Sequence, residues 1–231
     1  MLFGKNGAAT SGRSDLSIVD TTTMYCADAP RFQARLTEVG VEYGDCPVSG
    51  MPFRAENGTL TMMFGGNEGA FERIRPYLDV MGEFIVYCGE CGTGQMMKAF
   101  NNVIYDINIA GVCEILPMAI KAGLKSETLE RVLTTASACH FASEYFIQRL
   151  LDRRFDTNFA MEDAYKDIVN VQQIATRLNA STPLVNAMVS TYQNAIAMGF
   201  GKEPKSAMVK VYEKALGMEV PRNVDDASTN K

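Results

Sequence analysis

The segment with the clearest chemical potential runs from Gly92 to Asn102, where a glycine-rich turn leads into an apolar helical pattern. Lys98 and Asn102 stand four residues apart and therefore lie on one face of that helix. Methionine, alanine and phenylalanine flank Lys98, so few charges surround it. Because burial and the positive end of a helix both disfavour an ammonium ion, we expect a Lys98 pKa lowered toward the range that suits proton transfer. The alternative is an ordinary helical lysine whose stem packs while its amine reaches solvent.

A CxxC pair, Cys88 and Cys91, has the spacing of a redox or a zinc site. Zinc needs about four ligands, and the sequence holds no second cysteine pair or histidine pair, so we expect no metal site. A thiol redox site begins a helix after the first strand of a βαβ unit, whereas this pair ends a predicted strand. We interpret both cysteines as structural and place a thiol redox protein third among the candidate functions. His140, the one histidine, is expected to pack or to end a helix rather than act as a base.

The elements that must position these residues form two groups. Before Gly92, β-branched runs alternate with helical patterns, which indicates an α/β layer with helices packed on a sheet. After Gly94 the strand signals stop, and one long helical pattern covers residues 95–122 with Gly123 at its C-terminal end. Strands are predicted at 16–22, 41–48, 59–64 and 84–87, and helices at 29–39, capped by Asp28, and at 68–81, 126–138, 141–151, 161–178, 183–198 and 204–216.

Composition excludes several classes of protein. Of the 231 residues, 47% are apolar and 21% are charged, which is typical of globular proteins and excludes disordered and fibrous chains. The net charge of −5 argues against a nucleic-acid partner and gives no basic surface for membrane binding. Six cysteines are too few for a disulfide scaffold, the first residues lack an apolar signal segment, and the most apolar stretch, 103–120, contains Asp106 and Glu114. We therefore expect a soluble, cytoplasmic protein.

The spacing of Gly92, Gly94, Lys98 and Asn102 resembles the catalytic motif of the β-hydroxyacid dehydrogenases, the group that contains 3-hydroxyisobutyrate dehydrogenase, tartronate semialdehyde reductase and glyoxylate reductase. Other segments are similar to family motifs in the same order and at family spacing: 19–23 (VDTTT), 45–50 (DCPVSG), 58–66 (GTLTMMFGG) and 166–167 (KD). The resemblance extends from about Leu2 to Val220.

The resemblance implies a role for each matching residue at the substrate. Lys98 would be the general acid/base, and Asn102 would fix the substrate beside it as part of the catalytic pair. Ser49 and Gly50 would bind the substrate carboxylate. Without the resemblance, Ser49 and Gly50 also fit a simple turn that ends a strand.

Two further residues are implied at the cofactor. Thr23 and Lys166 would contact NAD or NADP. The residues by themselves leave Thr23 as a strand or helix-cap threonine, and they leave Lys166 in a surface ion pair with Glu162, four residues earlier. Open α/β sheets bind ligands beyond the carboxyl ends of their strands, which is where Thr23 is expected.

Three positions depart from related patterns. Met51 stands where the family usually has a second glycine, so we expect a narrower or differently shaped substrate pocket. Tyr105 and Asn101 stand where 6-phosphogluconate dehydrogenases carry a catalytic glutamate and a histidine. Both differences favour a simple hydroxyacid dehydrogenase over a decarboxylating enzyme.

A dinucleotide-binding domain opens with a G-x-G-x-x-G turn between its first strand and helix, and the sequence contains no such turn. The resemblance implies that the chain begins inside the cofactor domain, with NAD(P) binding impaired and a Val-, Ile- and Thr-rich sheet edge left unpaired. We predict a fold of α/β plus all-α class: a partial Rossmann-type domain at 1–91, a helical domain like that of 6-phosphogluconate dehydrogenase at 92–220, and a polar tail at 221–231.

The sequence thus favours an NAD(P)-dependent oxidoreductase that transfers hydride between nicotinamide and a small hydroxy acid or semialdehyde. The alternative is a truncated, non-catalytic homologue that serves in dimerisation or binds a metabolite. By resemblance, the helical domains pair through their long helices, so a homodimer or tetramer is expected. The choice of hydroxy acid, and of NAD or NADP, stays open.

Overall fold

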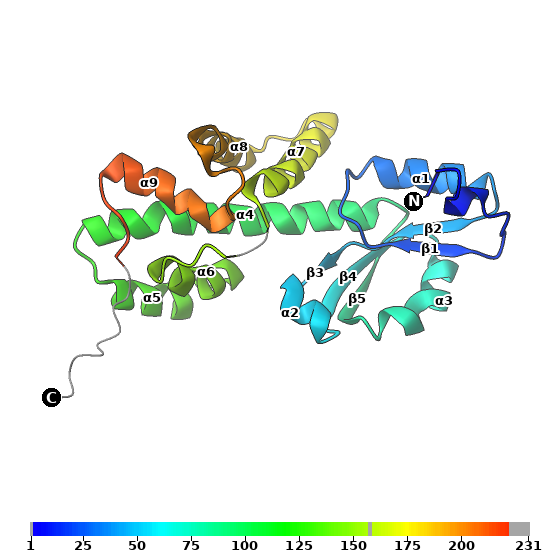
Figure 1. Cartoon of the computed structure of the whole chain (residues 1–231), viewed down its shortest axis with the longest axis horizontal. Helices are drawn as coiled ribbons and strands as arrows, with labels where there is room; N and C mark the ends of the chain where they lie inside the picture. The colour runs from blue at the N-terminus through cyan, green and yellow to red at the C-terminus, as the bar shows by residue number, and fades with distance from the viewer. Residues whose placement is uncertain (1, 157–158, 222–231) are drawn as a thin grey trace. The chain divides into compact units, whose positions relative to one another are not determined.

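The computed structural model describes residues 2–156 and 159–221 (Figure 1). Its contacts divide the chain into two compact units, Met1–Asn101 and Asn102–Lys231, and each is described by itself. The boundary falls within a single long helix, α4 (Thr93–Lys121). Apart from Pro221, the predicted polar tail lies outside the described residues.

The first unit is built on a five-stranded mixed sheet. Its strands are β1 (Ser17–Asp20), β2 (Glu42–Asp45), β3 (Val48–Ser49), β4 (Leu60–Gly65) and β5 (Gly82–Gly89). Strand β1 runs parallel to β2, and β4 runs parallel to β5. Both β2 and β3 pair antiparallel with β4, so they act as one extended segment. Pro47 interrupts that segment because it has no N–H for the ladder, and the single strand predicted at 41–48 is therefore divided.

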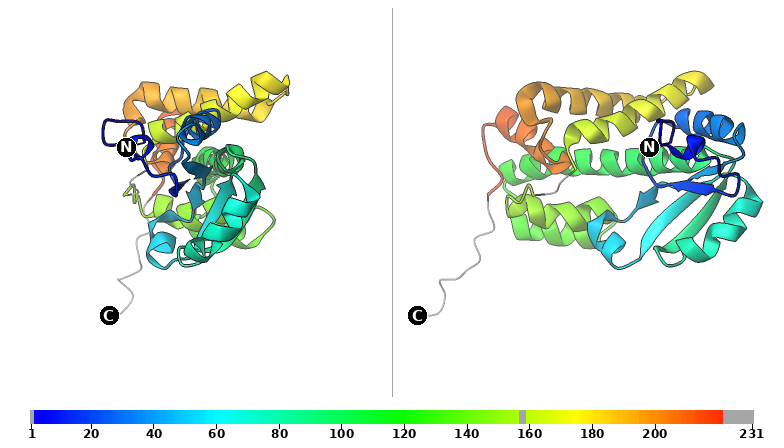
Figure 2. Two further views of the ribbon diagram at one scale, coloured as in Figure 1. Left: turned by 90° about the vertical axis from the view of Figure 1, so that its right-hand side faces the viewer. Right: turned by 45° about the vertical axis from the view of Figure 1, so that its right-hand side comes forward.

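Among its described residues, this unit contains three complete α-helices, α1 (Asp28–Thr37), α2 (Met51–Glu56) and α3 (Glu68–Leu78), together with the first turns of α4. Neighbouring residues of β1 show that α1 and α3 cover opposite faces of the sheet, since side chains alternate along a strand. Ile18 packs in the cluster that contains Leu36 of α1, whereas Val19 packs in the cluster that contains Phe71 of α3. Figure 2 shows the two helices on either side of the strands.

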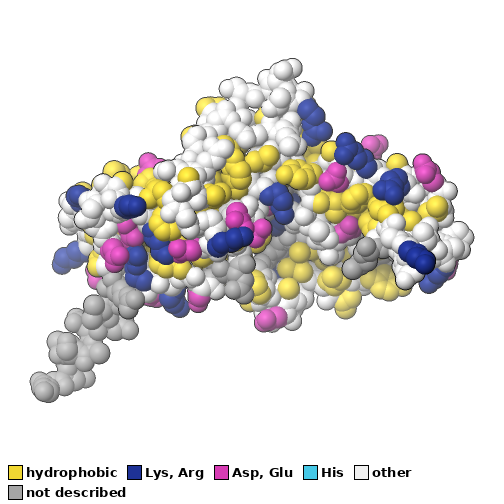
Figure 3. Space-filling view, turned by 45° about the horizontal axis from the view of Figure 1, so that its top comes forward, with side chains coloured by type: hydrophobic (Ala, Val, Ile, Leu, Met, Phe, Trp, Pro, Cys, Tyr) yellow, Lys and Arg dark blue, Asp and Glu magenta, His cyan; other side chains and the backbone are white. Residues whose placement is uncertain are grey.

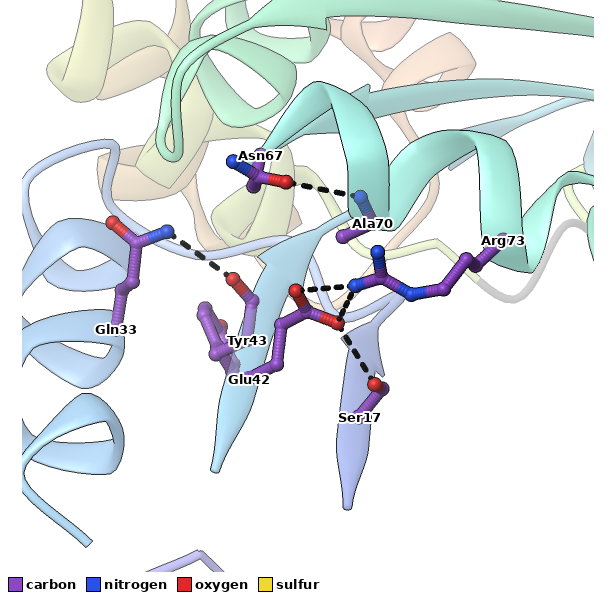
Figure 4. Close-up of polar contacts among 7 residues, drawn as sticks. All are labelled: Ser17, Gln33, Glu42, Tyr43, Asn67, Ala70 and Arg73. Atoms are coloured by element: carbon purple, nitrogen blue, oxygen red, sulfur yellow. Dashed lines mark hydrogen bonds and ion pairs between the residues drawn. The ribbon is translucent and has the colours of Figure 1, made fainter. Parts of the chain in front are cut away.

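A polar network joins the amino ends of the first strands to α3 (Figure 4). The Arg73 guanidinium donates to both carboxylate oxygens of Glu42, at 2.7 and 2.8 Å, and the Ser17 hydroxyl donates to the same carboxylate at 2.9 Å. Burial raises the pKa of Glu42, but the hydrogen bonds from Arg73 and Ser17 outweigh it, and the net pKa is lowered. These contacts hold the amino ends of β1 and β2 against α3.

Strand β1 forms an open edge: among the described residues, β2 is its only strand partner. Ile18 and Val19 on that edge are half-buried. An unpaired edge was predicted from the sequence, but it was expected to be rich in Val, Ile and Thr, and β1 contains one Val, one Ile and no Thr.

The second unit is helical. After α4 come α5 (Ser126–Thr135), α6 (Phe141–Leu151), α7 (Met161–Leu178), α8 (Pro183–Ala195) and α9 (Val209–Leu216). Ile109 and Leu116, two turns apart on α4, are fully buried, as are Ile147 of α6 and Ile168 of α7. By length and composition α4 is apolar enough to cross a membrane, but 44% of its most apolar window is buried, and core helices of soluble proteins pass the same test.

The predicted helices at 141–151 and 161–178 have the bounds of α6 and α7, and His140 is a helix-end residue as expected. Its Nδ1 accepts a hydrogen bond from the Ser143 amide at 3.0 Å and caps α6. The prediction for Asp28 was wrong, because this residue lies inside α1 and its carboxylate contacts Arg31 at 3.4 Å. The helix predicted at 183–198 ends earlier, at Ala195, and a short π-helical turn follows.

Candidate active site

A fully buried carboxylate from β2 caps the amino end of α4. Asp45 Oδ1 accepts the Gly92 amide at 2.5 Å, and Oδ2 accepts the Gln95 amide at 2.7 Å. The first amides of a helix have no partner within it, so Asp45 satisfies donors that would otherwise be buried alone. Burial raises the pKa of Asp45, although these two hydrogen bonds act in the opposite direction. Asp45 begins the 45–50 segment that resembles a family motif, and the sequence patterns predicted no role for its carboxylate.

Two glycines allow the approach of backbone to backbone around this carboxylate. A Cβ on Gly94 would lie 2.3 Å from the Met63 carbonyl oxygen and 2.7 Å from Asp45 Oδ2. A Cβ on Gly65 would lie 2.8 Å from the Gly94 nitrogen. The glycine-rich end of β4 and the glycine turn before α4 therefore pack against each other, and neither site has room for a side chain.

The side chain of Gln95 joins α4 to the loop after β1. Its Nε2 donates to the Thr22 carbonyl at 2.7 Å, and its Oε1 accepts the Met24 amide at 3.0 Å. Gln95 is only 1% exposed. Asp20 holds the same loop from the strand side, because its carboxylate accepts the Thr22 amide at 2.9 Å. Thr23 is half-buried and lies between Thr22 and Met24, whose backbone groups are both held by the Gln95 side chain.

Lys98 lies one turn beyond Gln95 on α4 and is half-buried. The first unit therefore brings together three segments that are far apart in the sequence: the loop with Thr23, the β2–β3 segment that contains Asp45, and the turn that leads to Lys98. Asp45 and Gln95 make the hydrogen bonds between them.

Ser49 and Gly50 lie where β3 gives way to α2, and both are half-buried. Gly50 has a φ of 148°, and a Cβ there would meet Arg54 Cβ at 2.8 Å. Met51 follows with a φ of 61°, in the left-handed region that disfavours a side chain. The sequence patterns did not predict α2, a helix of six residues that begins at Met51.

The second unit holds the other predicted site residues. Asn102 is buried, and its Nδ2 donates to Asp167 Oδ2 at 2.7 Å. Because a carboxylate only accepts, this bond fixes which end of the Asn102 amide faces α7. Lys166 is exposed beside Asp167 on α7. Its predicted rival partner, Glu162, instead pairs with Lys202.

A buried ion pair continues the polar face of α4, and sequence reasoning missed it. Asp106 follows Asn102 by one turn, is fully buried, and lies 2.5 Å from Lys205 Nζ. Burial raises the pKa of Asp106, while Lys205 lowers it. The fully buried Tyr192 has a raised pKa because of its burial and the nearby Asp106 carboxylate. The sequence offered one sign of this ion pair, namely the acidic Asp106 within the apolar helical stretch 103–120.

The cysteine pair lies beside this site without the properties of reactive thiols. Cys88 and Cys91 are unbridged. Burial, with the Asp45 charge added, raises the pKa of Cys88 and raises that of Cys91 to about 12. Thiolates are the reactive form, so both environments disfavour nucleophilic chemistry. Within the part of the chain that the structure describes, no group of three or more His, Cys, Asp or Glu side chains is arranged to hold a metal ion.

The residues present fit a dinucleotide site in part. Thr23 follows the carboxyl end of β1, and the turn to α4 follows that of β5, the side on which open α/β sheets bind ligands. The glycine turn that would hold a pyrophosphate is not in the sequence. The described residues therefore include the strand ends at which such folds bind ligands, and the given sequence holds no glycine motif for a pyrophosphate.

Comparison with known families agrees with this architecture. Residues 1–89 match the NAD binding domain of 6-phosphogluconate dehydrogenase, and residues 92–212 match the family described as NAD-binding of NADP-dependent 3-hydroxyisobutyrate dehydrogenase. The fold is thus a partial Rossmann-like nucleotide-binding domain followed by a long helix and a helical domain of the 6-phosphogluconate dehydrogenase type. The chain belongs to the 3-hydroxyisobutyrate dehydrogenase family, within the β-hydroxyacid dehydrogenases.

Individual relatives are similar along most of the chain. It is 32% identical to 2-(hydroxymethyl)glutarate dehydrogenase of Eubacterium barkeri, covering 95% of this chain and 73% of that protein. It is 32% identical to 2-hydroxy-3-oxopropionate reductase of Escherichia coli, covering 92% of this chain and 73% of the relative. The crystal structure of 3-hydroxyisobutyrate dehydrogenase from Salmonella typhimurium superposes with a TM-score of 0.82 at 28% identity, over 89% of this chain and 72% of the other.

Proposed function

We propose that this chain is an NAD(P)-dependent oxidoreductase acting on small hydroxy acids, with Lys98 as general acid/base. One observation carries the proposal: hydrogen bonds from Asp45 and Gln95 join the Thr23 loop, the β2–β3 segment and the turn before Lys98. These are the three segments of the first unit that the family resemblance assigns to cofactor, substrate and proton transfer.

Each residue has a defined task in the oxidation of a hydroxy acid. The neutral Lys98 amine takes the hydroxyl proton as the C–O bond becomes a carbonyl. A bound nicotinamide would supply the acceptor for the hydrogen and electron pair that leave the carbinol carbon. The Ser49 hydroxyl and the Gly50 amide donate hydrogen bonds to the substrate carboxylate. Asn102, one turn beyond Lys98, holds the reacting oxygen beside the amine, and reduction reverses these steps.

The substrate class follows from chemistry and from the relatives. A carboxylate bound near a hydroxyl-bearing carbon requires a short acid, and two similar proteins are named for a hydroxymethyl acid and a hydroxy-oxo acid. We assign Thr23 and the exposed Lys166 to the cofactor in the same proposal. We also propose a cytoplasmic location and a homodimer or tetramer.

Replacement of Lys98 tests the proposal. We expect Lys98→Met to lower kcat for NAD(P)-dependent oxidation of short hydroxy acids by about 10²–10⁴-fold, because general acid/base catalysis contributes about that much. Lys121→Met, an exposed lysine at the end of the same helix, is the matched control and should change kcat less than about twofold. Unchanged turnover in Lys98→Met would show that the acid/base assignment is wrong.

A second candidate is a non-catalytic homologue that dimerises through α4, and specific side chains favour it. Ile104, Ile115 and Met118 on this helix are 63%, 43% and 50% exposed. Figure 3 shows one side of the chain, on which hydrophobic side chains lie among charged side chains of both signs. This candidate predicts a dimer in analytical ultracentrifugation without NADH binding in calorimetry, so micromolar NADH affinity would exclude it.

A further inference from the structure

We propose that Gln95 is a positioning residue that sets the loop carrying Thr23 against the helix turn carrying Lys98. The proposal rests on the function proposed above and adds a residue to it. Gln95 lies one turn before Lys98, and its buried amide bonds the residues on either side of Thr23, namely Thr22 and Met24.

The orientation of the Gln95 amide is fixed by chemistry. The Thr22 carbonyl oxygen can only accept, so it must face Nε2, and the Met24 amide can only donate, so it must face Oε1. Its own backbone N–H is held by Asp45 at 2.7 Å, which anchors the residue from behind. Both ends of the side chain and the main chain are therefore used, and Gln95 has one geometry in which every bond is made.

This geometry matters because two transfers occur in one reaction. The proton moves at Lys98 while the hydrogen and electron pair move at the nicotinamide, which Thr23 is proposed to contact. Their separation must stay within a fraction of an ångström, since a misplacement of about 1 Å costs about 10²-fold in rate. Asp20 holds the loop from β1, but Gln95 holds it from α4 and sets its distance to the helix.

Three variants distinguish a positioning role of the Gln95 hydrogen bonds from a role of the side-chain volume alone. Gln95→Met keeps the volume and removes both hydrogen bonds. Gln95→Glu restores both bonds when its carboxyl is protonated, because that group has one donor and one acceptor, and it loses the donor when ionised. Burial raises the pKa of a carboxylic acid, so the protonated form is reached in mild acid. Gln33→Met is the matched control, because Gln33 joins α1 to the Tyr43 carbonyl at 3.3 Å elsewhere in the unit (Figure 4).

The first measurement is hydrogen exchange of the Met24 amide in the full chain, each variant being compared with wild type at the same pH. We expect exchange about tenfold faster in Gln95→Met at every pH, the equivalent of one hydrogen bond, and no change in Gln33→Met. In Gln95→Glu, exchange should approach the wild-type rate near pH 5, where both hydrogen bonds form. Near pH 8 the ionised carboxylate still accepts the Met24 amide but has no donor for the Thr22 carbonyl, so exchange should lie between the rates of wild type and Gln95→Met. Wild-type protection in Gln95→Met, or no recovery of Gln95→Glu in acid, would overturn the proposal.

The second measurement is turnover. We expect kcat about 10- to 100-fold lower in Gln95→Met with the hydroxy-acid KM nearly unchanged, and recovery of kcat in Gln95→Glu toward acidic pH relative to wild type. A kcat equal to wild type in Gln95→Met would overturn the proposal. If the wild-type chain neither binds NAD(P)H nor turns over, the proposed function fails by itself, and hydrogen exchange still decides whether Gln95 holds the loop.

Discussion

Met51 has a left-handed backbone conformation directly beside the residues proposed to bind the substrate. Its φ of 61° is unfavourable for any residue with a Cβ, and the family resemblance implies a glycine at this position. Gly50 just before it also has a positive φ, so the chain makes a sharp turn directly after Ser49. The strain lies beside the residues proposed to bind the carboxylate, where a larger side chain would alter the choice of substrate.

Replacement of Met51 by glycine should stabilise the protein. Relief of the left-handed strain is worth about 1–2 kcal/mol, and the added freedom of glycine in the unfolded chain offsets about 0.5–1 kcal/mol of it. We therefore expect the free energy of unfolding in urea to rise by about 0.5–1 kcal/mol. Met118→Gly, the same exchange at an exposed helical position of α4, should destabilise. A loss of stability in both variants would contradict the strain argument.

At the scale of elements, the placement of α4 depends on a helix cap that comes from strand β2. Asp45 is 47 residues from Gly92 and 50 from Gln95, yet its carboxylate supplies the acceptors that the start of α4 lacks. Gly65 and Gly94 make room for it. Any change in this cap shifts the helix that carries Lys98.

Asp45→Ala should therefore be more damaging than loss of an ordinary cap. We expect about 2 kcal/mol or more lost from the free energy of unfolding, because two buried amides lose their acceptor. Asn67→Ala is the comparison: Asn67 caps α3 by accepting the Ala70 amide at 3.1 Å (Figure 4), and we expect about 1 kcal/mol for its loss. Equal losses of unfolding free energy for Asp45→Ala and Asn67→Ala in chemical denaturation would show that the cap from β2 contributes no more than an ordinary helix cap.

At the scale of the whole molecule, the chain covers 73% of the length of two relatives and carries both family-matched regions. The helical unit has a charged interior, in which Asp106 and Asp167 are buried with Lys205. Glu213 is also buried in this unit, where it pairs with Arg153. Burial and the Asp167 charge raise the pKa of Asp106, while Lys205 lowers it.

Removal of Lys205 should give a stability loss that depends on pH. We expect Lys205→Met to cost about 3–5 kcal/mol near neutral pH, because it leaves a buried carboxylate without its cation. Without Lys205 the folded-state pKa of Asp106 rises further above its unfolded value, so the folded chain keeps a proton that the unfolded chain releases. Stability then falls as pH rises through that window, and the deficit in urea should be larger at pH 8 than at pH 5.

The exposed Lys202, which pairs with Glu162, provides the control for this experiment. Lys202→Met should behave almost as wild type at both pH values, since an exposed ion pair adds little to stability. A Lys205→Met deficit that is the same at pH 5 and pH 8 would mean that Asp106 does not control the pH dependence.

The sequence by itself determined the order of most helices and strands and the residues of the family motifs. Local periodicity and turn residues predicted α6 and α7 with their observed bounds, and the spacing of Lys98 and Asn102 placed them on one face of α4. These features depend on neighbours within a few residues, so a linear pattern contains the information. The six-residue α2 had too short a pattern to be predicted.

Only the tertiary structure decided what holds those residues in place. The partners of Asp45, Gln95 and Asn102 lie 47 to 73 residues away in the chain. A buried carboxylate or amide bonds whichever group the packing brings to it, and a linear pattern does not specify that group. The family motifs marked the residues for chemistry, and the hydrogen bonds across the fold fixed their positions.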